Sequence, residues 1–140
     1  GLADPRGLQI CVEAWDTYDR LGSPEGDLAL AQAVIYLAST AKSNAGYVAF
    51  KAAQSDVRET GTLDVPLHLR NAPTKLMKSL GYGRDYQYDH DADGGVALDQ
   101  TGFPDALGER IYYRPVERGM EIKLKEKLDR LRAARRQARG

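Results

Sequence analysis

The chain has 140 residues, 42% of them hydrophobic, and its 20 Lys and Arg balance 20 Asp and Glu. This composition excludes wholesale disorder, and the length suits one domain, so we expect residues 1–140 to form a single helical domain. The sequence holds no apolar run of about 18 residues, which argues against a membrane partner, and its one cysteine excludes an internal disulfide. The zero net charge argues against a uniformly basic nucleic-acid binder.

Three amphipathic helices are predicted in the first half. Each has a capping signal at its start: Asp4-Pro5, then Ser23-Pro24, then Ser43 or Asn44. Gly22 ends the first helix and Gly61 ends the third. Apolar residues recur at helical spacing in all three (Leu8, Cys11, Val12, Trp15 and Tyr18; Leu28, Ala31, Ile35 and Ala38; Val48, Ala52 and Val57).

We expect these apolar stripes to be buried, with Trp15 in the core and Cys11 as a buried, inert thiol. The short linkers favour antiparallel neighbours, so the first half is predicted to be a helical bundle.

The second half is less regular. A proline-interrupted segment, residues 65–70, precedes a short predicted helix over residues 73–80 and a long loop over residues 82–110. We expect aromatic residues to pin this loop to the helices (Tyr82, Tyr86, Tyr88 and Phe103). A last helix begins near Gly119, with one apolar stripe (Met120, Leu124, Leu128 and Leu131). The predicted fold is therefore all-α, a helical bundle with a long irregular loop in its second half.

The acidic turn over residues 89–94 places acids at the first, third and fifth positions of a calcium loop. Its twelfth position is Gln100 where a bidentate Glu is needed, so a solvated acidic turn is the better interpretation. His90 between Asp89 and Asp91 could form an acid/base unit, but no nucleophile motif lies nearby. Structural hydrogen bonds are the simpler role for both histidines, His68 included.

Polar donors also cluster around the start of the short helix, over residues 68–75. One interpretation is an anion site in which free N–H groups and Lys75 converge. The favoured alternative is capping by Asn71 or Thr74, with Arg70 paired to an acid.

Charge is divided unequally along the chain. Residues 117–140 contain nine basic and four acidic side chains, a net charge of +5, and residues 1–116 carry −5. A solvated helix face explains the basic end, because cations are favoured near a helix C-terminus. The alternative is a DNA-contacting helix that uses its arginines (Arg132, Arg135 and Arg136).

The chain does not begin with Met, and it carries no phosphate-binding loop, no G-x-G-x-x-G and no H-E-x-x-H motif. We therefore expect a piece of a longer protein that has no catalytic residue, cofactor or metal of its own.

A long central motif resembles the C-terminal region of the RarA/MgsA family of AAA+ ATPases, whose eukaryotic relatives include the Werner-helicase-interacting protein. The resemblance rests on residues 65–78 and 81–83, and on shorter matches that include residues 3–6, 42–45 and 90–91. The matching motif positions, predicted to be structural or assembly elements, are Pro66, His68, Leu69, Arg70, Asn71, Pro73, Lys75, Gly81, Tyr82, Gly83, His90 and Asp91.

The resemblance implies a helical domain, similar to the collar of clamp-loader subunits, that assembles its parent into a homotetramer. It implies that ATP and Mg²⁺ are used by an ATPase core upstream of this stretch, and that the parent acts in DNA replication, recombination and repair. DNA and single-strand-binding protein are the implied partners, and the nucleoid in the bacterial cytoplasm is the implied location. No catalytic residue is carried over.

Overall fold

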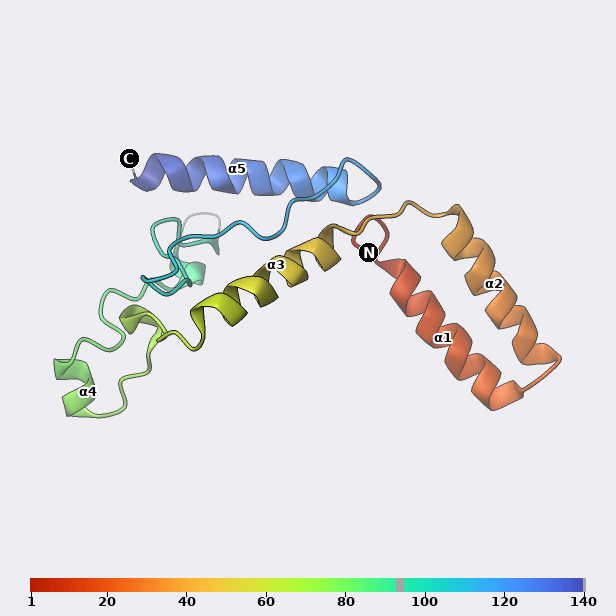
Figure 1. The fold of residues 1–140 in the computed structure, drawn as a ribbon, viewed down its shortest axis with the longest axis horizontal. Coiled ribbons are helices and arrows are strands. Elements are labelled where there is room, and N and C mark those ends of the chain that lie inside the picture. Colours follow the sequence, from red (N-terminus) through yellow and green to blue (C-terminus); the bar gives the residue numbers. More distant parts are fainter. Residues whose placement is uncertain (93–94, 140) are drawn as a thin grey trace. The chain divides into compact units, whose positions relative to one another are not determined.

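The computed structural model describes residues 1–92 and 95–139, and over these residues it is helical with no strand (Figure 1). Its α-helices are α1 (Arg6–Leu21), α2 (Glu25–Ser39), α3 (Ala45–Thr60), α4 (Lys75–Ser79) and α5 (Glu121–Arg139). Two short 3-10 helices are η1 (Leu67–Leu69) and η2 (Asp89–Asp91). The predicted all-α class is confirmed, whereas the likeness to a clamp-loader collar stays a prediction. Among the described helices, none is long and apolar enough to cross a membrane.

The chain divides into two compact units. The first contains Gly1–Lys51 and Tyr113–Lys127, and the second contains Ala52–Tyr112 and Leu128–Gly140. Helices α3 and α5 each contribute residues to both units. The prediction of one assembly domain over the whole chain stays a prediction.

In the first unit, α1 and α2 pack together through small residues. The buried positions of the two helices are Gly7, Ala14, Gly26 and Ala33. A Cβ built on Gly26 would lie 2.8 Å from the Cα of Tyr18, so the close approach of the helices requires glycine there. The helices therefore approach each other most closely at glycines, where Leu37 lies against Gly7 and the Tyr18 ring against Gly26. Leu8, Val12 and Trp15 lie outside this contact.

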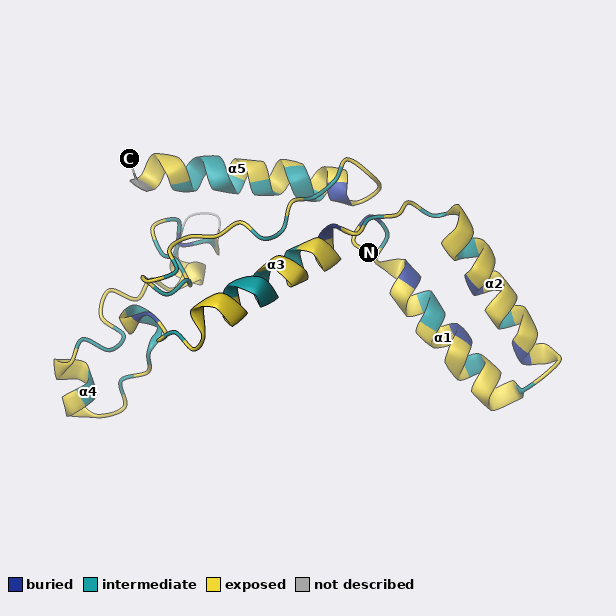
Figure 2. Cartoon of the chain, in the orientation of Figure 1, coloured by how far each residue is buried: buried dark blue, intermediate teal, exposed yellow. Residues whose placement is uncertain are grey.

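The predicted burial of the apolar stripes is wrong for all three helices (Figure 2). On α1, Leu8 is 76% exposed and Trp15 is 72% exposed, while Cys11 is half-buried. On α2, Leu28 and Ile35 are also exposed, as are the three stripe positions of α3. Helical spacing shows which residues share a face, but the faces that pack here are those whose small residues allow the backbones to approach.

Local capping agrees with the sequence at the first and third helices but not at α2, where Ser23 Oγ donates to the Asp27 carboxylate at 2.7 Å and no side chain caps an amide. Asp4 Oδ1 accepts a hydrogen bond from the Arg6 amide at 3.1 Å, and Ser43 Oγ accepts one from the Ala45 amide at 3.1 Å. Asp4 also accepts hydrogen bonds from the hydroxyls of Thr40 and Tyr36, and these bonds lower the pKa of the Asp4 carboxyl. Asp4 thereby ties the start of α1 to the end of α2.

Glu121, the first residue of α5, is fully buried in the first unit, at 0% exposure. Its carboxylate accepts hydrogen bonds from the Tyr113 hydroxyl at 2.7 Å and from the Val116 amide at 3.3 Å. Burial acts to raise the pKa of Glu121, but these hydrogen bonds outweigh it and the pKa is lowered. Burial and the bond to Glu121 raise the pKa of Tyr113 to about 12. Glu121 therefore ties the start of α5 to the segment that precedes it through a buried, hydrogen-bonded charge.

Gly119 allows the chain to pass close to the N-terminal segment just before α5. Its φ is +52°, and a Cβ there would lie 2.1 Å from the Ala3 carbonyl oxygen. That same oxygen accepts a hydrogen bond from the Met120 amide at 2.8 Å.

Gly119→Ala should therefore destabilise the first unit. The left-handed backbone alone costs an alanine about 1–2 kcal/mol, and the clash with Ala3 adds to this cost. Gly46→Ala is the matched control, because Gly46 lies in α3 with nothing within 4 Å of its Cβ position. That control should be neutral or stabilising by up to about 1 kcal/mol. Urea unfolding followed by circular dichroism checks both, and equal stability of the two variants would contradict the role given to Gly119.

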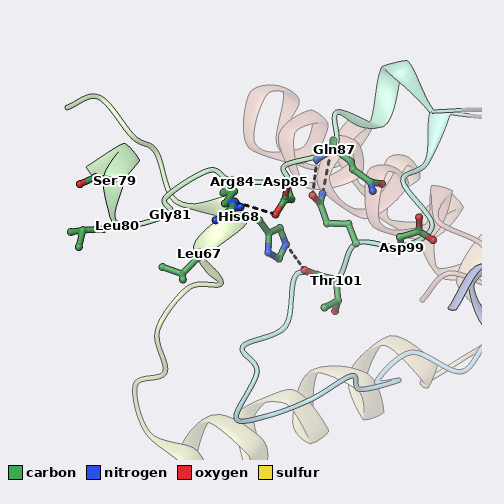
Figure 3. A pocket seen from close by; sticks show the side chains of 11 residues that line it. Leu67, His68, Ser79, Leu80, Gly81, Arg84, Asp85, Gln87, Asp99 and Thr101 are labelled. Atoms are coloured by element: carbon green, nitrogen blue, oxygen red, sulfur yellow. Dashed lines mark hydrogen bonds and ion pairs between the residues drawn. The ribbon is translucent and has the colours of Figure 1, made fainter. Parts of the chain in front are cut away.

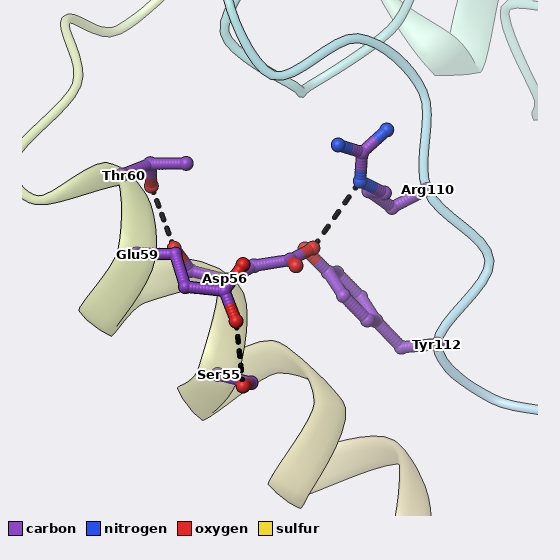
Figure 4. A network of polar contacts seen from close by, with 6 residues as sticks. All are labelled: Ser55, Asp56, Glu59, Thr60, Arg110 and Tyr112. Carbon is purple, nitrogen blue, oxygen red and sulfur yellow. Dashed lines mark hydrogen bonds and ion pairs between the residues drawn. The ribbon is translucent and has the colours of Figure 1, made fainter.

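In the second unit, Asp56 of α3 holds the segment that follows the long loop (Figure 4). Its Oδ2 accepts hydrogen bonds from the Tyr112 hydroxyl at 2.8 Å and from Arg110 Nε at 3.2 Å. The ring of Phe103 lies 6.0 Å from that of Tyr112. The described part of the loop is irregular apart from η2, as predicted. Its aromatic anchoring is only partial, because Tyr86 and Tyr88 are exposed.

The apolar stripe of α5 is half-buried at Leu124, Leu128 and Leu131. Met120 precedes the helix and is exposed. The predicted stripe is thus found on the helix itself, and the predicted start near Gly119 is two residues early.

Candidate functional site

The central motif folds around Arg70 in the second unit. Its guanidinium donates to the Val65 carbonyl oxygen at 2.6 Å and to the Tyr82 hydroxyl at 3.3 Å, and it lies 3.4 Å from the Asp64 carboxylate. It also lies 5.2 Å from the centre of the Tyr82 ring, within the range of a cation–π contact. The hydrogen bond with Tyr82 is the main cause that raises the pKa of Arg70. One side chain therefore connects both ends of the motif.

Two further contacts fix the motif. The Gly83 amide donates to the Leu67 carbonyl at 2.8 Å, and a Cβ on Gly83 would lie 3.3 Å from the Arg70 carbonyl oxygen. His68 Nε2 lies 3.0 Å from the Thr101 carbonyl oxygen, so this histidine has the structural hydrogen bond expected of it. Pro66 is buried and Leu69 is half-buried, whereas Asn71 and Pro73 are exposed.

Arg70→Lys should lower the melting temperature of the chain. A lysine amine cannot donate simultaneously to Val65, Tyr82 and Asp64 with the planar geometry of a guanidinium. Arg84→Lys is the matched control, because the side chain of Arg84 is 81% exposed and its contact with Asp85 is 3.8 Å long. Thermal unfolding checks the pair, and equal melting temperatures would contradict the anchoring role of Arg70.

The motif lines one side of an open groove of about 630 Å³ (Figure 3). Leu67, His68 and Gly81 of the motif form this side, together with Leu80, which lies between the two parts of the motif. The rest of the lining comes from the long loop and the end of α4 (Ser79, Arg84, Asp85, Gln87, Asp99, Gln100 and Thr101). Sequence reasoning missed these loop residues, because nothing in their local pattern indicates that they return to the motif.

Gln100 orders the loop side of the groove. Its Oε1 accepts from the Gln87 amide at 2.9 Å, and its Nε2 donates to the Gln87 carbonyl at 3.2 Å. One side-chain amide therefore pairs with both backbone groups of Gln87 and holds two parts of the loop together.

The predicted anion site at the start of α4 does not assemble. Thr74 caps the helix, because its Oγ1 accepts from the Met77 amide at 3.2 Å. Arg70 is engaged with Tyr82 and Asp64, and Lys75 is exposed. The capping alternative is confirmed, with Thr74 and not Asn71 as the cap.

The acidic turn has structural contacts of its own. Asp89 Oδ1 accepts from the Ala97 amide at 2.7 Å, and the His90 ring lies 4.9 Å from that of Tyr88. His90 and Asp91 are exposed. Two positions of the calcium-loop pattern, residues 93 and 94, lie outside the described residues. Over the described residues, no group of three His, Cys, Asp or Glu side chains is placed to hold a metal ion.

The three arginines proposed for DNA contact differ in exposure. Arg136 is exposed, whereas Arg132 is half-buried and lies 3.7 Å from Asp129. Arg135 is also half-buried, and its Nε is buried with no hydrogen-bond partner among the described atoms. The structure therefore does not present the three arginines as one exposed set.

A different feature stands out on the first unit. Leu8, Val12 and Trp15 follow one another at spacings of four and three residues on α1, so they form one exposed apolar stripe, here named the α1 stripe. Exposed Leu28 and Ile35 are seven residues apart on α2, which also places them on one face. Contiguous apolar surface of this kind marks a contact surface in soluble proteins.

Comparison with known proteins covers most of the chain. The model of the family described as "MgsA AAA+ ATPase C terminal" matches residues 1–132. Replication-associated recombination protein A of Coxiella burnetii is 59% identical over 92% of this chain, and that of Escherichia coli K12 is 52% identical over 91%. ATPase WRNIP1 of Dictyostelium discoideum is 36% identical over 81% of this chain. The chain spans 29% of the length of the first two relatives and 13% of the third.

Proposed function

The chain belongs to the family of C-terminal regions of MgsA AAA+ ATPases, and from this membership we propose that it assembles copies of such an ATPase into a homotetramer. The relatives named replication-associated recombination protein A support a parent that acts in replication-associated recombination. On this proposal ATP and Mg²⁺ are bound by the AAA+ core of the parent, and this chain holds the subunits together.

The α1 stripe is the observation that carries the assembly role. Full burial of a valine or leucine side chain contributes about 1.5–3 kcal/mol, and this stripe leaves Leu8, Val12 and Trp15 more than half exposed. The small-residue contact between α1 and α2 explains how the hairpin forms without using them. Contact between copies would bury the stripe, and closed symmetric oligomers are the common outcome of such self-contact.

The mass of the chain in solution tests this proposal. Gel filtration coupled to light scattering should give four times the 15.4 kDa mass of one chain. A mass of 15.4 kDa at all concentrations would overturn the assembly role, and a dimer or trimer would overturn the tetramer.

DNA contact by α5 is the second candidate, and the separation of charge favours it. Basic residues are exposed along this helix (Lys123, Lys127, Arg130 and Arg136), and the +5 net charge of residues 117–140 would attract phosphates. On this candidate, forked or single-stranded DNA binds with strong salt dependence, and Arg136→Ala weakens binding more than Arg132→Ala. The absence of DNA binding at low salt would overturn this second candidate function. Single-strand-binding protein remains a proposed partner of the parent.

A further inference from the structure

The ends of four helices meet in the first unit. There α1, α3 and α5 begin and α2 ends, and Figure 1 shows the N-terminus beside the segment that joins α2 to α3. The connecting segments are here named the junction, which comprises residues 1–4, 40–43 and 118–121. Among the described helices, only α1 and α2 pack side by side, so the junction is what connects this hairpin to α3 and α5.

Asp4 closes the open end of the α1–α2 hairpin. Its carboxylate accepts hydrogen bonds from the Tyr36 hydroxyl at 2.5 Å and from the Thr40 hydroxyl. Tyr36 lies in the last turn of α2 and Thr40 directly follows that helix, whereas Asp4 precedes α1. Hydrogen bonds to a charged acceptor are about twice as strong as those between neutral groups. The two hydroxyls therefore hold the start of α1 against the end of α2.

The residues next to this contact hold the start of α5. Ala3 is 3% exposed, and its carbonyl oxygen accepts a hydrogen bond from the Met120 amide at 2.8 Å. On the other side of the hairpin, the Cβ of Ala41 lies 3.2 Å from the Cβ position of Gly119. Gly119 therefore lies against one residue from each end of the hairpin. A movement that separates these two ends displaces at least one of the contacts that hold α5.

The linker between α2 and α3 belongs to the same set of contacts. The Lys42 carbonyl oxygen accepts a hydrogen bond from the Arg118 guanidinium at 3.4 Å. Ser43 Oγ accepts one from the Ala45 amide at 3.1 Å, which caps the start of α3. A side chain at Gly1 would collide with the Ser43 carbonyl oxygen, so the N-terminal segment passes close to this linker. Residues that directly follow α2 therefore contact the segments before both α3 and α5.

We propose that the junction couples the α1–α2 hairpin to the first turns of α3 and α5, so that opening the hairpin at Asp4 frays both turns. The coupling acts through the connecting segments and requires no packing of the hairpin on either helix. It acts in both directions, because a coupling free energy between two sites is reciprocal. A ligand that holds the hairpin closed would therefore protect the first turn of α5 without touching it. This coupling is independent of the assembly role.

Amide hydrogen exchange on the double variant Tyr36→Phe with Thr40→Val tests the proposal. Both replacements keep the approximate shape of the side chain and remove the hydroxyl that donates to Asp4. Four amides report the coupling, and none of them bonds to a substituted residue (Met120, Ile122 and Leu124 at the start of α5, and Val48 at the start of α3). Their exchange should become at least about tenfold faster.

Tyr47→Phe with Thr60→Val is the matched control, because it removes the same two hydroxyls from exposed positions of α3. This control should leave the exchange of all four amides unchanged. The Gly83 amide, which donates to the Leu67 carbonyl in the second unit, is the internal reference and should keep its exchange rate in every variant. If the double variant does not fold, Tyr36→Phe alone should give a smaller increase at the same four amides.

Faster exchange confined to α1 and α2 would overturn the proposal, because the hairpin would then open without affecting its neighbours. Equal acceleration of the Gly83 amide would also overturn it, since the chain would then open as a whole. So would equal exchange rates in the double variant and the control. All variants are compared at one protein concentration and light scattering reports their mass, so the result does not depend on whether the chain assembles.

Discussion

Glu121→Ala is expected to lower the free energy of unfolding by about 2–4 kcal/mol. The substitution leaves the Tyr113 hydroxyl and the Val116 amide without their common acceptor in a fully buried position. Each buried donor that loses its partner costs about 1–3 kcal/mol, offset in part because a charge no longer has to be buried. Glu121→Gln keeps one acceptor oxygen and should therefore cost less than alanine.

Guanidinium unfolding at a fixed protein concentration measures this effect, because the proposed assembly would make stability depend on concentration. Glu13→Gln on α1 is the control, since Glu13 is exposed and its hydrogen bond to Gln9 is local. That control should change the free energy of unfolding by no more than about 0.5 kcal/mol. If Glu121→Ala resembles the control, the buried carboxylate does not anchor the start of α5.

The same carboxylate predicts how stability depends on pH. Its pKa is lowered below 4.5 in the folded chain, so the folded state binds fewer protons than the unfolded state as pH falls through this range. Its contribution is complete above pH 4.5 and is lost as pH falls through the lowered pKa. Tyr113 acts at the other extreme: its contribution is complete below pH 10 and is lost as pH rises toward 12. Glu121→Gln should make the free energy of unfolding depend less strongly on pH in the acidic range. Near neutral pH the free energy of unfolding of this variant should not change with pH.

Leu8→Gln combined with Trp15→Gln is expected to convert the proposed tetramer to monomers. Both side chains belong to the α1 stripe and are exposed within the chain, so polar replacements remove the proposed contact without opening a cavity. Glutamine is also a good helix former, which protects α1 itself. Light scattering should show the mass fall to 15.4 kDa, while circular dichroism keeps its helical signal.

Leu21→Gln is the matched control for the stripe. Leu21 is 60% exposed on the same helix, but its position along α1 places it on a different face from Leu8. This variant should remain tetrameric. The α1 stripe is not the contact surface if the double variant at Leu8 and Trp15 remains tetrameric. The same conclusion follows if Leu21→Gln also yields monomers.

The helices themselves could be predicted because their signals are local. The side chains of Asp4 and Ser43 accept from amides two residues on, and the Gly22 amide donates to the Tyr18 carbonyl. Each of the three lies where the sequence places a helix end. The buried faces could not be predicted in the same way. Trp15 lies on the most apolar stripe of α1, yet the face that packs on α2 is the one with Gly7 and Ala14. Periodicity identifies faces, but the partner decides which of them is buried.

Contacts that have no local signal in the sequence also could not be predicted. Glu121 occurs in a strongly charged helix, and nothing near it indicates that its carboxylate is fully buried and bonded to Tyr113. In the groove, Gln100 and Thr101 come from a loop without periodicity. The central motif was identified from its resemblance, but the role of Arg70 as its connecting side chain required the structure.

Trp15 provides the most direct measurement of the assembly role, because it is the sole tryptophan of the chain and lies on the proposed contact surface. Its fluorescence emission should be shifted to the blue at high concentration, where contact between copies excludes water. On dilution the emission should move to the red in step with the fall of mass from tetramer to monomer. A water-exposed emission spectrum from chains that light scattering shows to be tetrameric would contradict the account.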